Sequence, residues 1–169
     1  MKILANTLRA GALAAAIGGL ATAAAAMVTP QFHDVFGFLA VSVDADVANL
    51  PAWIRVPAIA APAACFAYAM WQLARLLQFV ARGEVFSAPA AGYLRACGLW
   101  LLITTLTGTL LPFVLQALNV WLTHPAHAEF GLTMSSQEVW NIFISAIFML
   151  VARVLSDAYR IAEDNRQII

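Results

Sequence analysis

Charged residues are scarce in this chain, because Asp, Glu, Lys and Arg together make up 11% of its 169 residues, against about a quarter in soluble domains. So few charges cannot cover the surface of a soluble protein. The nine basic residues are matched by nine acidic ones, so there is no excess of positive charge to attract nucleic-acid phosphates. We therefore expect neither a cytosolic enzyme nor a protein that binds nucleic acid directly.

Other chemical signals are missing too. Cysteine occurs twice, which is too few for a disulfide scaffold. The sequence has no glycine-rich phosphate loop, no nucleophile beside a base and no paired carboxylates, the usual patterns of catalytic sites. His124 and His127 are weak metal candidates, because zinc needs three or four converging ligands. We expect a protein that is not an enzyme and has no cofactor or bound metal.

Hydrophobic residues dominate instead, at 63% of the chain with a mean hydropathy of +0.82. They form four long runs nearly free of charge, and a bilayer core about 30 Å thick needs about 20 helical residues. Runs without alternation favour helices over strands. The sequence predicts an all-α fold, an integral membrane four-helix bundle of antiparallel up-down topology. It is one membrane domain, 1–169, with spans at about 8–28, 53–80, 90–122 and 137–160.

The basic residues are distributed unevenly around these spans. Eight of the nine lie at the start of the first span, between the second and third, or towards the chain end after the fourth. Because Lys and Arg are enriched in cytoplasmic loops, we expect both termini and the middle connection in the cytoplasm of a multi-pass bacterial inner-membrane protein. The first span resembles a secretory signal, although its length favours retention; the other spans keep their orientation in either case.

The spans are expected to continue beyond the membrane as helices. Arg75, Gln78 and Arg82 recur on one face up to Gly83, which predicts a helix that ends at this glycine. Ser87 is a typical N-cap for the next helix. Glu138 lies three residues after Ser135, a spacing that predicts a capping box at the start of the fourth span.

Polar residues inside the spans allow two interpretations. Depth counting along the spans places Gln116 level with Ser145 and Asn119 near Asn141, and no acidic or basic residue is expected at the bilayer centre. These amides and hydroxyls could line a hydrophilic pocket or pathway. The alternative is structural: hydroxyls bond back to their own helix and amides join neighbouring helices. We favour the structural interpretation, particularly for the threonines of the third span.

Two cytoplasmic stretches carry a family resemblance. One is Arg82-Gly-Glu-Val-Phe-Ser87, followed by a helix with Leu94-Arg95 and Gly98; the other is the terminal Ala162-Glu-Asp-Asn-Arg-Gln-Ile-Ile169. With four spans of matching spacing, the chain resembles the bacterial membrane family known as domain of unknown function 2975. The resemblance implies no established activity. It does imply a frequent pairing with a small helix-turn-helix regulator encoded nearby.

Our leading hypothesis is a membrane sensor or anchor that binds a cytoplasmic partner, such as a helix-turn-helix regulator. The alternative is a small transporter, channel or lipid-binding protein, and homo-oligomerisation stays open. The candidate partner-binding residues lie on the expected cytoplasmic face: Arg75, Arg82, Glu84, Phe86, Arg160, Glu163, Asp164 and Asn165. The intramembrane polar candidates are Gln116, Asn119, Asn141 and Ser145.

Overall fold

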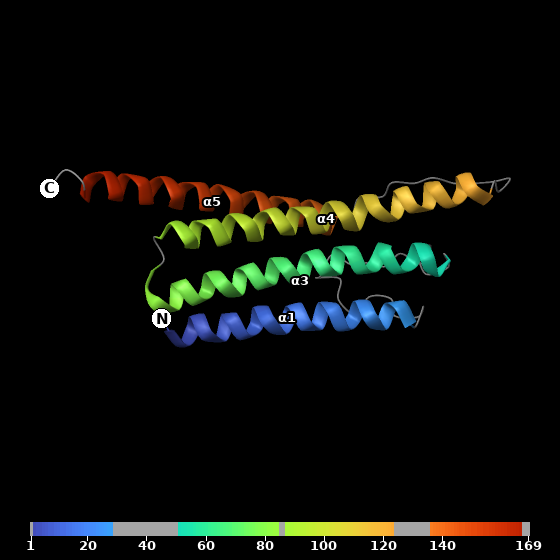
Figure 1. Ribbon diagram of the computed structural model, residues 1–169, viewed down its shortest axis with the longest axis horizontal. Helices are drawn as coiled ribbons and strands as arrows, with labels where there is room; N and C mark the ends of the chain where they lie inside the picture. Colours follow the sequence, from blue (N-terminus) through green and yellow to red (C-terminus); the bar gives the residue numbers. More distant parts are fainter. Residues whose placement is uncertain (1, 29–50, 85–86, 124–135, 167–169) are drawn as a thin grey trace.

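The computed structural model describes residues 2–28, 51–84, 87–123 and 136–166. Within these ranges the chain forms four α-helices (Figure 1): α1 (Lys2–Val28), α3 (Ala52–Arg82), α4 (Ala88–Thr123) and α5 (Ser136–Arg166). Each helix contains a stretch long and apolar enough to cross a membrane. Within the described residues, the prediction of an all-α fold with four helices of this kind is confirmed.

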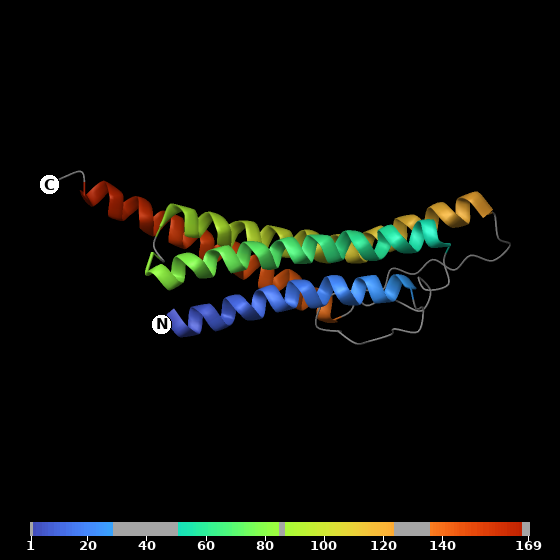
Figure 2. The same cartoon turned by 60° about the horizontal axis from the view of Figure 1, so that its bottom comes forward.

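The helices are packed in chain order. Figure 1 shows consecutive helices running in opposite directions along the long axis. The most extensive packing joins α1 to α3, α3 to α4 and α4 to α5. Figure 2 shows that the C-terminal part of α5 extends past the ends of the other helices.

Small side chains fill the interior, and large apolar ones face outwards. The buried apolar residues are mainly alanines such as Ala63, Ala69 and Ala90, whereas Leu, Ile, Val and Trp side chains are exposed along all four helices. A soluble protein would bury these large groups. Helices surrounded by lipid pack in this way, with small side chains between them and large apolar side chains facing outwards. Close approach of their backbones holds them together, because there is no water to exclude.

The turn between α3 and α4 is built as the sequence predicts. Gly83 has φ 82°, in the left-handed region, which glycine enters without steric cost. Its N–H donates to the Val80 carbonyl at 3.1 Å, and the Glu84 N–H donates to the Phe79 carbonyl at 3.0 Å, the paired bonds of a Schellman motif. On the other side of the turn, Ser87 Oγ accepts from the Ala90 N–H at 3.4 Å.

Two aromatic contacts define how α3 and α4 align. Tyr68 and Trp100 meet edge to face with ring centroids 4.7 Å apart, and Phe79 stacks on Tyr93 at 5.5 Å. Both pairs match residues at nearly equal distances from the turn. The two helices therefore form a helical hairpin, in which residues equally far from the turn lie side by side.

Gly98 aligns α4 with α5. A Cβ at this position would meet Phe148 Cβ at 3.0 Å and the Ser145 carbonyl oxygen at 3.1 Å, so only glycine permits the observed approach. Gln116 lies 18 residues further along α4, about 27 Å at 1.5 Å per residue. The depth counting that placed Gln116 level with Ser145, and Asn119 near Asn141, is therefore wrong. The counting assumed that the outer ends of the two spans lie at one depth, whereas α5 is displaced along α4 towards the turn between α3 and α4.

The same alignment brings Glu138 against α4. Thr109 Oγ1 donates to Glu138 Oε1 at 2.8 Å. Thr109 also lies 3.0 Å from the Thr105 carbonyl oxygen of its own helix, and Thr104, Thr105 and Thr107 likewise bond back to carbonyls of α4. The structural interpretation of these threonines is confirmed. The predicted capping box joins Glu138 to Ser135, which lies outside the described residues; the bond that the structure gives Glu138 is to Thr109, beyond the midpoint of α4.

Candidate functional site

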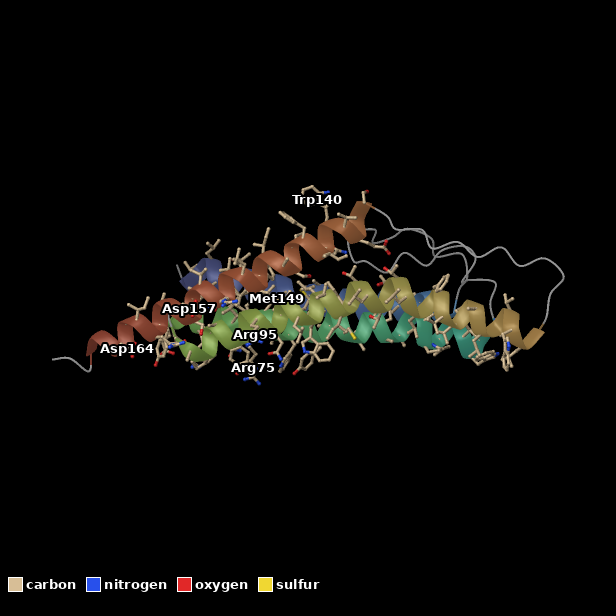
Figure 3. All side chains as sticks on the ribbon, turned by 90° about the horizontal axis from the view of Figure 1, so that it is seen from above. Arg75, Arg95, Trp140, Met149, Asp157 and Asp164 are labelled. Carbon is tan, nitrogen blue, oxygen red and sulfur yellow. The ribbon has the colours of Figure 1, made fainter. Side chains whose placement is uncertain are left out.

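Four arginines, one from each helix, lie at one level of the molecule. Arg9 and Arg75 line the same cavity between α1 and α3, and Arg95 and Arg153 line one groove between α4 and α5. Arg75 lies seven residues before the end of α3, and Arg95 lies seven residues after the start of α4. Figure 3 shows Arg75 and Arg95 at one position along the axis. We call this set the arginine level.

The groove between α4 and α5 has a volume of about 500 Å³. Its polar groups are two guanidinium groups, the Ser156 hydroxyl and the Asp157 carboxylate; all four side chains are exposed. The remaining lining is small or apolar, from Met149 and Ala152 on α5 and the first turns of α4. We call it the α4/α5 groove.

Two glycines of α4 explain why the groove opens where it does. At Gly98 a Cβ would touch α5, whereas at Gly92 it would meet no atom within 4 Å. The helices therefore touch at Gly98 and separate towards the start of α4. Small residues at Ala88, Ala91 and Gly92 leave the space between them unfilled.

The cavity between α1 and α3 is much smaller. It holds about 40 Å³ between Arg9, Leu13, Trp71 and Arg75, which is room for a water molecule. The Arg75 guanidinium lies 5.3 Å from the Trp71 ring centroid, within the range of a cation–π interaction. Arg9 Nε is buried, with no hydrogen-bond partner among the described residues.

The remaining candidates on this end of the molecule are spread along two elements. Arg82 closes α3 with its guanidinium 6.0 Å from the Phe79 ring, and Glu84 is exposed in the turn. Arg160 and Asp164 are exposed on α5. Gly98 packs against the turn Ser145–Met149 of α5, which is centred on residue 147. Nineteen residues of α5 follow that centre, whereas α4 begins ten residues before Gly98. At 1.5 Å per residue, α5 therefore reaches about 14 Å farther than α4; we call residues 158–166 the α5 extension.

Several candidates lie outside the described part of the chain: Phe86, His124 and His127, and the side chains of Gln116, Asn119, Glu163 and Asn165. Of the intramembrane polar set, Ser145 is fully buried and donates to the Asn141 carbonyl at 2.7 Å. Within the described residues, no three His, Cys, Asp or Glu side chains gather as metal ligands would. Cys65 and Cys97 are free thiols.

The sequence did not single out the α4/α5 groove. In the sequence, Arg95 contributed to the topology and to the family resemblance, Arg153 and Asp157 formed an i,i+4 pair that favours helix, and Ser156 carried no signal. The four polar residues of the groove come together because α5 packs against α4 at Gly98. From the sequence, only the position of each arginine at the end of its own span could be predicted. The structure brings Arg95 and Arg153 into one groove, and it leaves Arg160 and Asp164 out of that lining.

These features define a class: an all-helical protein of the polytopic membrane type, with outward-facing apolar side chains and a charged end. Residues 40–169 match the family model described as Protein of unknown function (DUF2975). Because the match covers most of the chain, the protein belongs to this family, and the resemblance seen in the sequence is confirmed. No curated protein and no solved structure matches it significantly.

Proposed function

We propose that the protein is a sensor or anchor in the bacterial inner membrane, an antiparallel four-helix bundle with both termini in the cytoplasm, and that its cytoplasmic end binds a protein partner. The arginine level supports this orientation, because arginines gather at the cytoplasmic ends of spans. It lies 20 residues along α3 from Arg55, which is the thickness of a bilayer core at 1.5 Å per residue.

The observation that carries the partner-binding role is the α5 extension. It reaches past the other helices (Figure 2) and exposes Arg160, Ile161 and Asp164 together. An exposed isoleucine between charged groups, beyond the arginine level, has no lipid to cover it. A partner surface that is apolar at its centre and charged at its rim would cover it, and the family resemblance makes a helix-turn-helix regulator the favoured partner.

Cross-linking in membranes at native expression, followed by purification of the tagged protein, tests this role. The full chain should retain a helix-turn-helix regulator, and a chain lacking residues 160–169 should lose it. A Leu122→Ala variant, altered at the opposite end of α4, should retain it and serves as the control. Equal recovery with the truncated chain, or no regulator with the full chain, would contradict the proposal.

One observation favours the alternative of a small transporter or channel. Glu138 lies 15 residues from Arg153 along α5, about 22 Å at 1.5 Å per residue, and so inside a core about 30 Å thick. Acidic groups at such depth often belong to ion or proton pathways. In this alternative, reconstituted vesicles should take up an ion or proton with wild-type protein and not with Glu138→Gln. If vesicles with either protein took up no ion or proton, Glu138 would have a packing role.

A further inference from the structure

We propose that the α4/α5 groove is a binding site for the phosphate headgroup of a membrane glycerophospholipid. The inference needs the arginine level to lie at the membrane surface, but it does not need the protein partner. Its contacts are with Arg95, Arg153, Ser156 and Asp157, all of which are retained when residues 160–169 are removed.

The charges of the lining match such a headgroup. Two guanidinium groups and one carboxylate give the groove an excess of one positive charge, and a phosphodiester carries one negative charge. Guanidinium groups form paired hydrogen bonds to phosphate oxygens. The Ser156 hydroxyl is a further donor, and the first turn of α4, which carries Ala88 and Ala91, adds the positive end of a helix dipole.

Asp157 selects among headgroups. A carboxylate accepts hydrogen bonds and cannot donate them, so beside a bound phosphate it needs a donor on the ligand. Ethanolamine and glycerol headgroups supply an ammonium or hydroxyl donor next to the phosphate, whereas choline has neither. The groove should therefore prefer phosphatidylethanolamine and phosphatidylglycerol to phosphatidylcholine.

The location also favours a lipid over a soluble anion. Arg95 and Arg153 end the longest apolar stretches of their helices, where headgroups lie, and Met149 and Ala152 continue the lining towards the apolar side. A lipid can place its phosphate at the arginines and its acyl chains along the exposed Val151 and Ile147 of α5, which lie on the membrane side of Arg153. Basic pockets between helices on the cytoplasmic side are where phospholipid headgroups bind.

The test uses the full chain, delipidated in detergent, with retained lipid measured by native mass spectrometry during titration with each phospholipid. Arg95→Gln/Arg153→Gln should weaken phosphatidylglycerol retention roughly tenfold, the equivalent of about 1.4 kcal/mol. Arg9→Gln/Arg75→Gln removes the same charge at the same level. Its cavity of about 40 Å³ is too small for a headgroup, so this control should change retention less than twofold, where twofold is about 0.4 kcal/mol.

A second groove variant is included in case Arg95→Gln/Arg153→Gln fails to fold. Gly92→Leu fills the groove without changing any charge, at a position where a Cβ meets no atom within 4 Å, and should weaken retention to a similar degree. Equal retention by wild type and both groove variants would overturn the proposal. So would equal retention of phosphatidylcholine, or binding of inorganic phosphate without any phospholipid. If the full chain retained phospholipid as expected but no regulator, only the proposed function would be contradicted.

Discussion

Thr109 Oγ1 lies 2.8 Å from Glu138 Oε1 and joins the middle of α4 to the first turn of α5. Together with the close approach of α5 at Gly98, this hydrogen bond determines how far α5 is displaced along α4. That displacement places Arg153 beside Arg95 and leaves the α5 extension beyond the other helices. The groove and the proposed partner surface both depend on it.

The Thr109–Glu138 bond should have a measurable coupling energy. The test is a double-mutant cycle of Thr109→Val and Glu138→Ala, unfolded from detergent micelles by sodium dodecyl sulfate. We expect a coupling of about 0.6 kcal/mol, the average for hydrogen bonds between membrane helices, and at most about 1.7 kcal/mol. Thr107→Val is the matched control, because Thr107 bonds to the Ile103 and Thr104 carbonyls of its own helix. A coupling with Thr109 no larger than that with Thr107 would contradict the alignment.

Alanine at two glycines of α4 should have opposite effects. Gly98→Ala places a Cβ 3.0 Å from Phe148 Cβ, and overpacking of this kind costs about 1–3 kcal/mol. Gly92→Ala meets no atom within 4 Å, so the higher helix propensity of alanine should stabilise the protein by about 0.5–1 kcal/mol. The same unfolding assay measures both. Similar changes at the two positions would mean that α5 does not pack against Gly98.

Gly83→Ala should destabilise the protein through the backbone alone. The position has φ 82°, and an added Cβ would meet no atom within 4 Å. A residue with a Cβ in the left-handed region costs about 1 kcal/mol. Gly11→Ala, at a helical glycine that also has open space around it, is the control and should not destabilise. If Gly83→Ala left the midpoint of unfolding unchanged, the left-handed conformation of Gly83 at the end of α3 would be contradicted.

The small interior predicts a contrast within α3. Ala69 is fully buried, so Ala69→Leu should overpack the interface and cost about 1–3 kcal/mol. Ala64 is exposed on the same helix, and Ala64→Leu should have little effect, because the added carbons face lipid or detergent. Equal tolerance of leucine at both positions in the detergent unfolding assay would contradict the assignment of the outward face.

Local features of this fold could be predicted from the sequence. Long runs without charge indicate spans because the bilayer thickness sets their length, and Gly83 and Ser87 mark helix ends because their preferences act within one turn. These signals are local, and the structure contains the helix ends that they predict.

Contacts between spans could not be predicted in the same way. Depth counting assumes that every span starts at one membrane surface, and it placed Gln116 level with Ser145. In the structure, Gly98 has no side chain and lets α5 approach α4 closely there, which sets a different alignment. A single sequence does not show which glycine makes such a contact. The α4/α5 groove depends on that contact, so it could not be found before the helices were placed.

The most direct test of the account is the side of the membrane on which the α5 extension lies. Asp164→Cys and Leu122→Cys, each in a background with Cys65 and Cys97 replaced by alanine, would be exposed to a membrane-impermeant maleimide in spheroplasts and in inverted vesicles. The account predicts labelling of Asp164→Cys only in inverted vesicles and of Leu122→Cys only in spheroplasts. Labelling of Asp164→Cys in intact spheroplasts would contradict it.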